Sequence, residues 1–269
     1  MVRAAVEEDL QALIGLRCAR CGGTPADAAG WLRQIAGLDH ILVGQPPAAM
    51  LGAVPVRCGE RRGVWFCGAA AADGVPLQTL LPRLLQGCLR AFAAKGYDFA
   101  LLTPDGADDA ARLEALGFQN LLPTRVLNKP IRRNLMAHAE FDSLTVHRWQ
   151  EMRLRYQPGC ITLPEDAMNE VMTQLYRRGL TIVSNRRGYG LYFARGGCLQ
   201  FLELQADQDY CADILLQAAR EKTGAEQARI LLAENQALYL GAGRRCGYGM
   251  IAFLRQEFPI TDVYFRMLL

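Results

Sequence analysis

The amino-acid sequence predicts an α/β (α+β) protein with two domains, and three observations lead to this prediction. The chain has 269 residues, which is nearly two domains at roughly 150 residues per domain. Hydrophobic residues make up 51% and charged residues 21% of the sequence, as in globular proteins that form cores of their own. Segments with helical and strand periodicity follow one another in an order that recurs in the second half of the chain.

The net charge, the apolar runs and the cysteine content predict which partners and which cellular compartment the protein has. Lysine and arginine total 30, aspartate and glutamate 27, and the resulting net charge of +3 predicts no nucleic-acid partner. No stretch approaches the roughly 20 continuous apolar residues of a membrane helix, so no membrane partner is expected. The acidic start MVRAAVEEDL is unlike a signal peptide. Nine cysteines, an odd number scattered through apolar runs, favour reduced thiols and a cytoplasmic location.

The first half is expected to begin with a strand at residues 2–5 and a helix at residues 7–19, where Leu10, Leu13 and Ile14 recur at helical spacing. Thr24 is a candidate N-cap for a second helix, because proline follows it. The other expected elements are strands at 41–44, 50–57 and 64–70, turns or loops at 45–47 and 59–63, a leucine-striped helix at 77–95, a strand at 97–103, a short helix at 108–116 and a strand at 125–129.

The second half repeats this order of elements with little residue identity. Its expected elements are helices at 144–156 and 163–178, strands at 181–184, 190–195 and 198–204, a helix at 207–222, a strand at 228–233, a short helix at 235–240 and a strand at 262–269. The segment 131–143 is polar and lacks clear periodicity. We therefore expect domains at residues 1–130 and 144–269, joined by a linker at 131–143.

Four local patterns in the first half carry a resemblance to a known family. They are the opening VRAAVEEDLQAL, the strand WFCGAA at 65–70, the segment KGYDFALLTP at 95–104 and the run RLEALGF at 112–118. Together with the element order, they resemble the GNAT superfamily of acyl-CoA-dependent N-acetyltransferases. The two-domain type similar to the enhanced-intracellular-survival family fits best, without that family's third domain. The resemblance implies tandem GNAT-like domains, each a mixed, mostly antiparallel sheet flanked by helices, with the second domain degenerate.

The resemblance also implies where acetyl-CoA would bind. The pantetheine arm would pair with the backbone of the central strand, and the pyrophosphate would lie at the start of the long helix, where N–H groups point outward. The cofactor-binding candidates are Cys67, Gly68, Ala69 and Ala70 on the strand and Gln78, Thr79 and Leu80 at the helix start.

The loop before that helix departs from the family pattern. Family members carry glycines there, which let the backbone approach the pyrophosphate, whereas this interval reads PLQTLL at residues 76–81. We expect Thr79 to cap the helix, which would place Pro82 at its third position, where a missing N–H is tolerated. The sequence therefore predicts a formed helix with a degenerate acyl-CoA loop.

Catalytic groups are hard to assign from the sequence. Leu113 stands where the family motif often has a tyrosine that protonates the leaving thiolate, and leucine cannot transfer a proton. Asp73, just after the central strand, and Glu114 are the candidates for a base. In the second half, Asp207 and Asp209 stand at the equivalent strand–helix junction. Their carboxylates would repel a phosphate, so no cofactor site is expected there.

Two further clusters allow more than one interpretation. Cys18 and Cys21 form a CxxC pair, but no second ligand pair completes a zinc site, so ordinary thiols near a helix end are the alternative. A basic cluster at residues 125–133, namely Arg125, Lys129, Arg132 and Arg133, could hold the 3′-phosphate of CoA or be a solvated strand end.

These observations leave two functions open. The first is an acyl-CoA-dependent N-acyltransferase, expected to use acetyl-CoA and to act on a small amine. The alternative is a non-catalytic GNAT-fold protein that binds CoA weakly, or another ligand or partner. The sequence leaves the oligomeric state undetermined and is compatible with a dimer.

Overall fold

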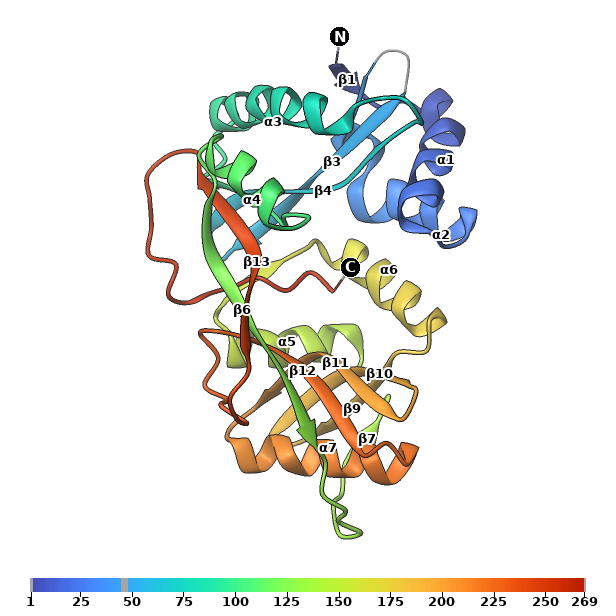
Figure 1. The fold of residues 1–269 in the computed structure, drawn as a ribbon, viewed down its shortest axis with the longest axis vertical. Coiled ribbons are helices and arrows are strands. Elements are labelled where there is room, and N and C mark those ends of the chain that lie inside the picture. The colour runs from blue at the N-terminus through green and yellow to red at the C-terminus, as the bar shows by residue number, and fades with distance from the viewer. Residues whose placement is uncertain (1, 45–47, 269) are drawn as a thin grey trace. The chain divides into compact units, whose positions relative to one another are not determined.

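A computed structural model describes residues 2–44 and 48–268, and of residues 2, 78 and 79 the backbone alone. The expected turn at 45–47 lies outside the described residues. The chain divides into two compact units (Figure 1). Unit 1 contains residues 1–121, 162–171 and 248–259, and unit 2 contains residues 122–161, 172–247 and 260–269. Neither unit is continuous in sequence, so this division differs from the expected domains at 1–130 and 144–269.

Unit 1 contains a six-stranded sheet whose strand order is β1-β2-β3-β4-β5-β13. Its elements are β1 (Val2–Ala4), α1 (Leu10–Cys21), α2 (Pro25–Gly30) with a π-helical continuation (Trp31–Ala36), β2 (Ile41–Gly44), β3 (Ala49–Cys58), β4 (Arg61–Ala71), α3 (Leu77–Ala94), β5 (Phe99–Leu102) and α4 (Ala107–Glu114). The last strand, β13 (Arg244–Phe253), comes from near the end of the chain. Only the β4–β5 pair is parallel, and the other neighbours are antiparallel.

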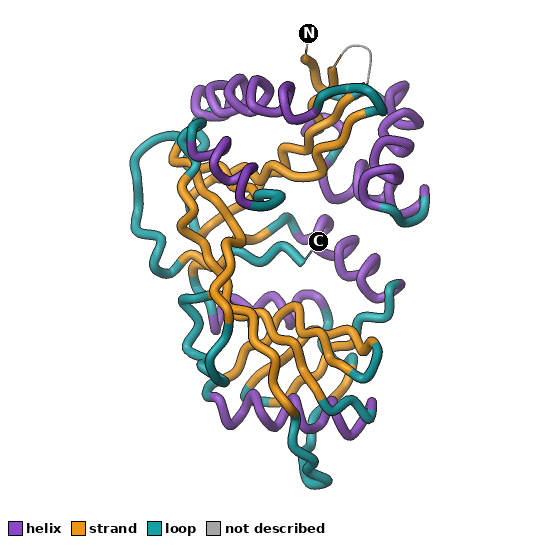
Figure 2. The backbone as a smooth tube through the Cα atoms, in the orientation of Figure 1, coloured by secondary structure: helices purple, strands orange, loops and turns teal. Residues whose placement is uncertain are grey.

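The strands of unit 2 have the order β7-β9-β10-β11-β12-β6, and we call them the sheet of unit 2. Its elements are β6 (Gln119–Pro130), β7 (Glu140–Phe141), α5 (Val146–Tyr156), β8 (Gly159–Thr162), α6 (Glu165–Arg177), β9 (Thr181–Asn185), β10 (Gly188–Arg195), β11 (Cys198–Ala206), α7 (Asp209–Thr223), β12 (Gln227–Ala233) and β14 (Val263–Tyr264). The boundary between the units falls within β6, β8, α6 and β13. Figure 2 shows the strands of both sheets bordered by helices.

Alternation along the strands gives each sheet two buried faces. In unit 1, Leu85 of α3 and Leu113 of α4 share a hydrophobic cluster with Phe66 of β4 and Ala100 of β5. On the opposite face, α1 packs against β3 and β4. In unit 2, Leu215 of α7 belongs to the corresponding cluster. None of the described helices combines the length and apolar character that crossing a bilayer requires.

Most expected elements are confirmed, and three expectations are wrong. The hairpin between β3 and β4 has a two-residue turn at 59–60 rather than a loop at 59–63. The segment 235–240 forms no helix. The strand expected at 262–269 shortens to β14, which pairs in parallel with β8. By contrast, Thr24 caps α2 as expected, since its hydroxyl accepts a hydrogen bond from the N–H of Asp27 at 3.1 Å.

Asp9 connects the first strand to the first helix and makes stability depend on acid pH. Its carboxylate accepts hydrogen bonds from both terminal nitrogens of Arg3 at 2.6 and 2.8 Å and from the N–H of Val6 at 2.9 Å. These bonds, Arg3 first, lower the pKa of Asp9 to about 2. A depressed folded-state pKa adds stability that is present above about pH 4 and is lost as the pH falls towards 2.

We expect Asp9→Asn to lower the free energy of unfolding by about 1 kcal/mol at pH 7, since Arg3 is partly exposed to solvent. The difference from wild type should shrink as the pH falls from 4 to 2, and urea denaturation over that range measures it. An effect of the substitution that did not change with pH would contradict the assignment.

Candidate functional site

The site begins where the parallel strands β4 and β5 separate. Their pairing ends at Trp65 and Leu101. Beyond that point β4 continues to Ala71 and stays paired with β3, through Met50 opposite Ala70 and Ala49 opposite Ala71. One edge of β4 therefore turns its backbone groups towards the space that β5 has left.

A bulge at Gly68 bends β4 at this opening. The β3–β4 register shifts between Met50 and Gly52, and Gly68 has a φ of +63°. A Cβ atom at Gly68 would lie 2.6 Å from the Cη2 atom of Trp31. Only glycine combines this backbone conformation with this close approach, and such bulges redirect backbone groups at functional sites.

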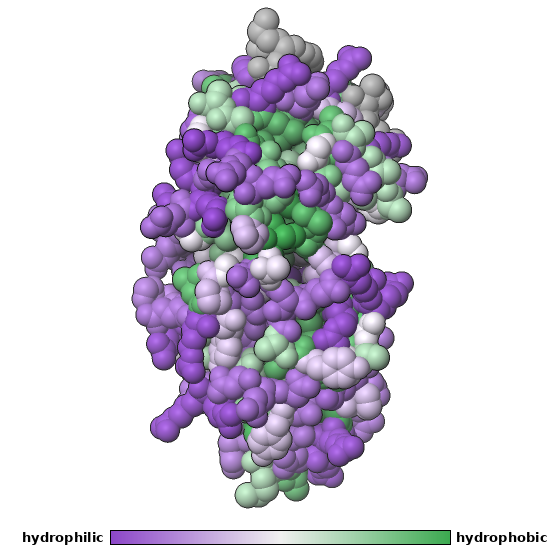
Figure 3. Space-filling model, turned by 90° about the vertical axis from the view of Figure 1, so that its left-hand side faces the viewer, coloured by the Kyte–Doolittle hydropathy of each residue, from purple (hydrophilic) through white to green (hydrophobic). Residues whose placement is uncertain are grey.

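The separated strands open onto a cavity of about 760 Å³ in unit 1, a size suited to a small ligand or cofactor arm. Its walls are largely apolar: Phe66 comes from β4, Leu77, Leu81 and Leu85 come from α3, and Leu113 comes from α4. The three α3 leucines are four residues apart and form one stripe along the helix. On the face drawn in Figure 3, hydrophobic patches are separated from one another by hydrophilic side chains.

Three of the four strand residues predicted to bind the cofactor line this cavity. They are Cys67, Gly68 and Ala69. Ala70 is buried and lies outside the lining, whereas Ala71 belongs to it. The predicted strand residues therefore lie beside this cavity, and their role in binding a cofactor stays a prediction.

The start of α3 differs from the expectation. The helix begins at Leu77, with Pro76 at the N-cap position, so the prediction that Thr79 caps the helix is wrong. Pro82 consequently lies inside the helix, past its first turn. A proline there removes one backbone hydrogen bond of the helix. The apolar stripe of α3 compensates, because its residues from Leu81 to Phe92 pack against the sheet over about three turns.

Among the predicted helix residues Gln78, Thr79 and Leu80, the structure describes the side chain of Leu80 alone. Leu80 lies outside the lining, while Leu77 and Leu81 form part of it. The side chains of Gln78 and Thr79 lie outside the described atoms. Leucines therefore lie beside the start of α3, where the family resemblance would place glycines. A ligand must pass these bulkier side chains to contact the backbone N–H groups of the helix.

Cys67 lines the cavity, and its thiol is neutral. Burial raises its pKa strongly, Arg17 opposes this rise in part, and Cys21, another lining residue, adds to it. A thiol with a raised pKa is a poor nucleophile. We therefore treat Cys67 as part of the wall.

Charged side chains form the polar part of the lining, and the sequence did not point to them. Arg20 of α1 and Asp105 form an ion pair at 2.6 Å, and the carboxylate of Asp109 accepts a hydrogen bond from the N–H of Asp105 at 3.0 Å. Asp108 and Arg112 also line the cavity. Three acids against two arginines leave this part slightly acidic, which favours a cationic group over a free phosphate.

Neither predicted base lies in this lining. Asp73 is exposed in the turn after β4, and Glu114 is exposed at the end of α4. Leu113, at the position of the expected proton donor, is buried and lines the cavity. Among the described lining residues, Asp108 and Asp109 are the carboxylates whose chemistry would suit a base or an ammonium partner.

In the basic cluster at 125–133, Arg125 and Lys129 contact residues of unit 2 and lie outside the cavity lining. Arg125 donates hydrogen bonds to the carbonyl groups of Leu238 and Tyr239 at 2.9 and 2.7 Å. Lys129 pairs with Asp213 at 2.8 Å. These partners support the alternative of a strand end with structural contacts. Within the described ranges, no three His, Cys, Asp or Glu side chains are arranged to hold a metal ion.

Comparison with known proteins places the fold. No protein-family model and no curated protein matches the sequence. Among solved structures, the chain is similar to a GCN5-related N-acetyltransferase from Anabaena variabilis (TM-score 0.71, 12% identity, covering 95% of this chain and 73% of that one). It is similar to Eis1 from Mycobacterium abscessus (TM-score 0.66, 12% identity, 94% and 74%). It is also similar to a tandem GNAT protein from the clavulanic acid biosynthesis pathway (TM-score 0.54, 10% identity, 95% and 98%).

These similarities confirm the expected fold. The chain has a two-domain GNAT fold of the α/β class, with mixed, mostly antiparallel sheets flanked by helices. At such low identities the comparisons establish the fold alone.

Proposed function

We propose that the protein is an acyl-CoA-dependent N-acyltransferase that uses acetyl-CoA and acts on a small amine. The observation that carries this proposal is the separation of β4 and β5 around the Gly68 bulge, which turns backbone groups of β4 towards the cavity. Acyl transfer from a thioester requires a polarised carbonyl, an oriented amine and the removal of one proton from that amine, which Asp108 or Asp109 of the lining can accept. Backbone N–H groups at the opening supply the first, and the acidic lining suits the second.

Asp108 is the carboxylate that we expect to attract the amine. It lines the cavity at the start of α4 and is exposed. We expect Asp108→Asn to raise the KM for the amine roughly threefold to tenfold, because one partly solvated charge pair is lost. Asp73→Asn, which changes an exposed acid outside the cavity, is the matched control. Steady-state assays of amine-dependent CoA release measure both variants, and an equal effect in both would contradict the assignment.

The first experiment is a calorimetric titration with acetyl-CoA at low salt. Micromolar binding would support the proposal and would be followed by a screen of amine acceptors for CoA release. No binding at millimolar acetyl-CoA would overturn it. Leu81→Glu provides the specificity control, since a carboxylate in the cavity wall should abolish binding to that site by repelling the cofactor phosphates.

One observation favours a non-catalytic role. The cavity has leucines at the start of α3 and Leu113 in place of a proton donor, so its walls suit an apolar ligand better than a pyrophosphate. Under this alternative, the protein binds CoA weakly or binds another ligand or partner. Weak acetyl-CoA binding without CoA release across the amine screen would select this second function.

A further inference from the structure

The two units repeat one topology. In each, three antiparallel pairings lead to a single parallel pair, followed by an antiparallel strand from the other half of the chain. The parallel pairs are β4–β5 and β11–β12, joined by α3 and α7. The opening between β11 and β12 is therefore the counterpart in unit 2 of the cavity opening in unit 1.

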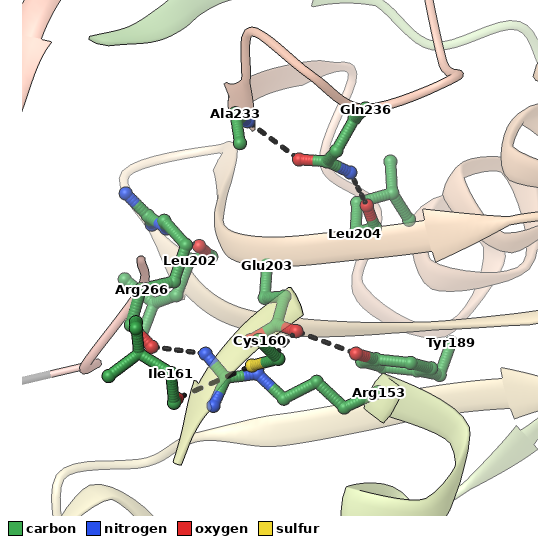
Figure 4. Close-up of polar contacts among 10 residues, drawn as sticks. All are labelled: Arg153, Cys160, Ile161, Tyr189, Leu202, Glu203, Leu204, Ala233, Gln236 and Arg266. Atoms are coloured by element: carbon green, nitrogen blue, oxygen red, sulfur yellow. Dashed lines mark hydrogen bonds and ion pairs between the residues drawn. The ribbon is translucent and has the colours of Figure 1, made fainter. Parts of the chain in front are cut away.

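A side chain of the protein itself bridges the opening in unit 2. Pairing of β11 with β12 ends at Phe201 and Ile230. Beyond it, the Oε1 atom of Gln236 accepts a hydrogen bond from the N–H of Ala233 at 2.6 Å. Its Nε2 atom donates to the carbonyl of Leu204 at 2.8 Å. Figure 4 shows the amide lying between the two strands, and Gln236 is buried.

The loop that carries Gln236 is fixed on both sides. The carboxylate of Asp209, at the first position of α7, accepts hydrogen bonds from the N–H groups of Tyr239 and Leu240 at 2.9 and 3.0 Å. Arg125 holds carbonyl groups of the same loop. Leu240 has a φ of +53° with a buried side chain, a conformation that a leucine keeps only when its surroundings enforce it.

We propose that the opening between β11 and β12 is a binding site for a primary amide, which the chain occupies with Gln236. One strand presents a donor and the other an acceptor, and a primary amide satisfies both. A carboxylate lacks the donor, and a hydroxyl is too small to reach both strands. The loop that carries Gln236 thus fills the opening between β11 and β12 of unit 2. The acetyl-CoA of the proposed function then binds once per chain, in unit 1. The amide site itself does not depend on the proposed acyltransferase function.

The test restores the missing amide from solution. Gln236→Ala removes a CH₂–CONH₂ group, which is acetamide less one hydrogen atom. We expect the variant to melt roughly 5 °C below wild type, because two buried hydrogen bonds are lost. Added acetamide should raise its melting temperature and leave that of wild type unchanged. N,N-dimethylacetamide, which cannot donate a hydrogen bond, should give no such rise.

Two further variants keep the result interpretable. Gln208→Ala removes the same group from an exposed glutamine of unit 2, leaves no enclosed space, and should not respond to acetamide. Gln236→Met fills the space without hydrogen bonds and should not respond either. If Gln236→Ala is unfolded in buffer, recovery of its circular dichroism by acetamide is the readout. A failure of acetamide to stabilise or refold Gln236→Ala beyond its effect on Gln208→Ala would overturn the proposal.

Discussion

Replacing Glu203 with alanine is expected to lower the free energy of unfolding by about 3–5 kcal/mol. The carboxylate of Glu203 is fully buried and lies 3.1 Å from the Nε atom of Arg153, which is 2% exposed. The hydroxyl of Tyr189 donates to the same oxygen at 2.6 Å. Burial, and then the charge of Glu203, raise the pKa of Tyr189 well above its ordinary value, so this hydroxyl stays a donor.

The size of this effect comes from the charge that is left behind. Arg153 also donates to the carbonyl of Arg266 and lies over the rings of Trp149 and Tyr264 at 5.2 and 5.5 Å. These groups offer no countercharge, so Glu203→Ala leaves a buried guanidinium without one. Figure 4 shows the contacts that join Arg153 to Glu203 and Arg266, and Glu203 to Tyr189.

Equilibrium denaturation in urea measures the loss. The double variant Glu203→Leu with Arg153→Met removes both charges together and should recover most of the stability, since apolar replacements of buried ion pairs are often neutral. If the double variant were as unstable as Glu203→Ala, the cost would lie in packing or in the Tyr189 hydrogen bond rather than in the uncompensated charge.

Sequence periodicity correctly predicted the helices whose formation depends on residues close together in the sequence. The leucine stripe of α3 and the capping threonine of α2 need only near neighbours in sequence, and both appear as expected. The segment 235–240 shows the limit. It has helical spacing, but Gln236 is used to bridge β11 and β12 and Arg125 holds the carbonyls beyond it. Contacts distant in sequence outweigh propensity there.

The sequence also did not predict that β6 and β13 each pair with a strand from the other half of the chain. Strand β13 was not assigned as a strand, and it pairs with β5, which lies about 150 residues earlier in the chain. Strand β6 was expected in the first domain, but most of it belongs to unit 2, where it pairs with β12. Either strand fits either sheet by alternation alone, so composition does not reveal which sheet it joins.

The sequence pointed to the strand that borders the candidate site, but it did not point to the acidic residues that line the cavity. A resemblance located β4 and the start of α3, because those patterns are local. Asp108 and Asp109 were expected at the beginning of a short helix, where acids are common, and Asp105 was given no role. Only the fold shows that this helix start lies beside β4 and that Arg20 of α1 reaches Asp105.

Replacing Gly68 with alanine is expected to remove both stability and the candidate site. The left-handed backbone costs a residue with a Cβ about 1–2 kcal/mol. The 2.6 Å approach to Trp31 adds an overpacking cost of about 1–3 kcal/mol, since Trp31 is buried and Arg17 lies over its ring at 3.8 Å. To relieve both, β4 must flatten its bulge, and the backbone groups then turn away from the cavity.

Gly59→Ala separates these two contributions. Gly59 also has a positive φ, of +58°, but a Cβ there would meet nothing within 4 Å. This control should lose only the conformational cost and should bind ligand as wild type does. Gly68→Ala should lose about 2–5 kcal/mol in urea denaturation and bind acetyl-CoA at least tenfold more weakly in calorimetry. Equal losses of stability and unchanged binding in the two variants would show that the bulge does not shape the site, and the proposed function would then lose the observation that carries it.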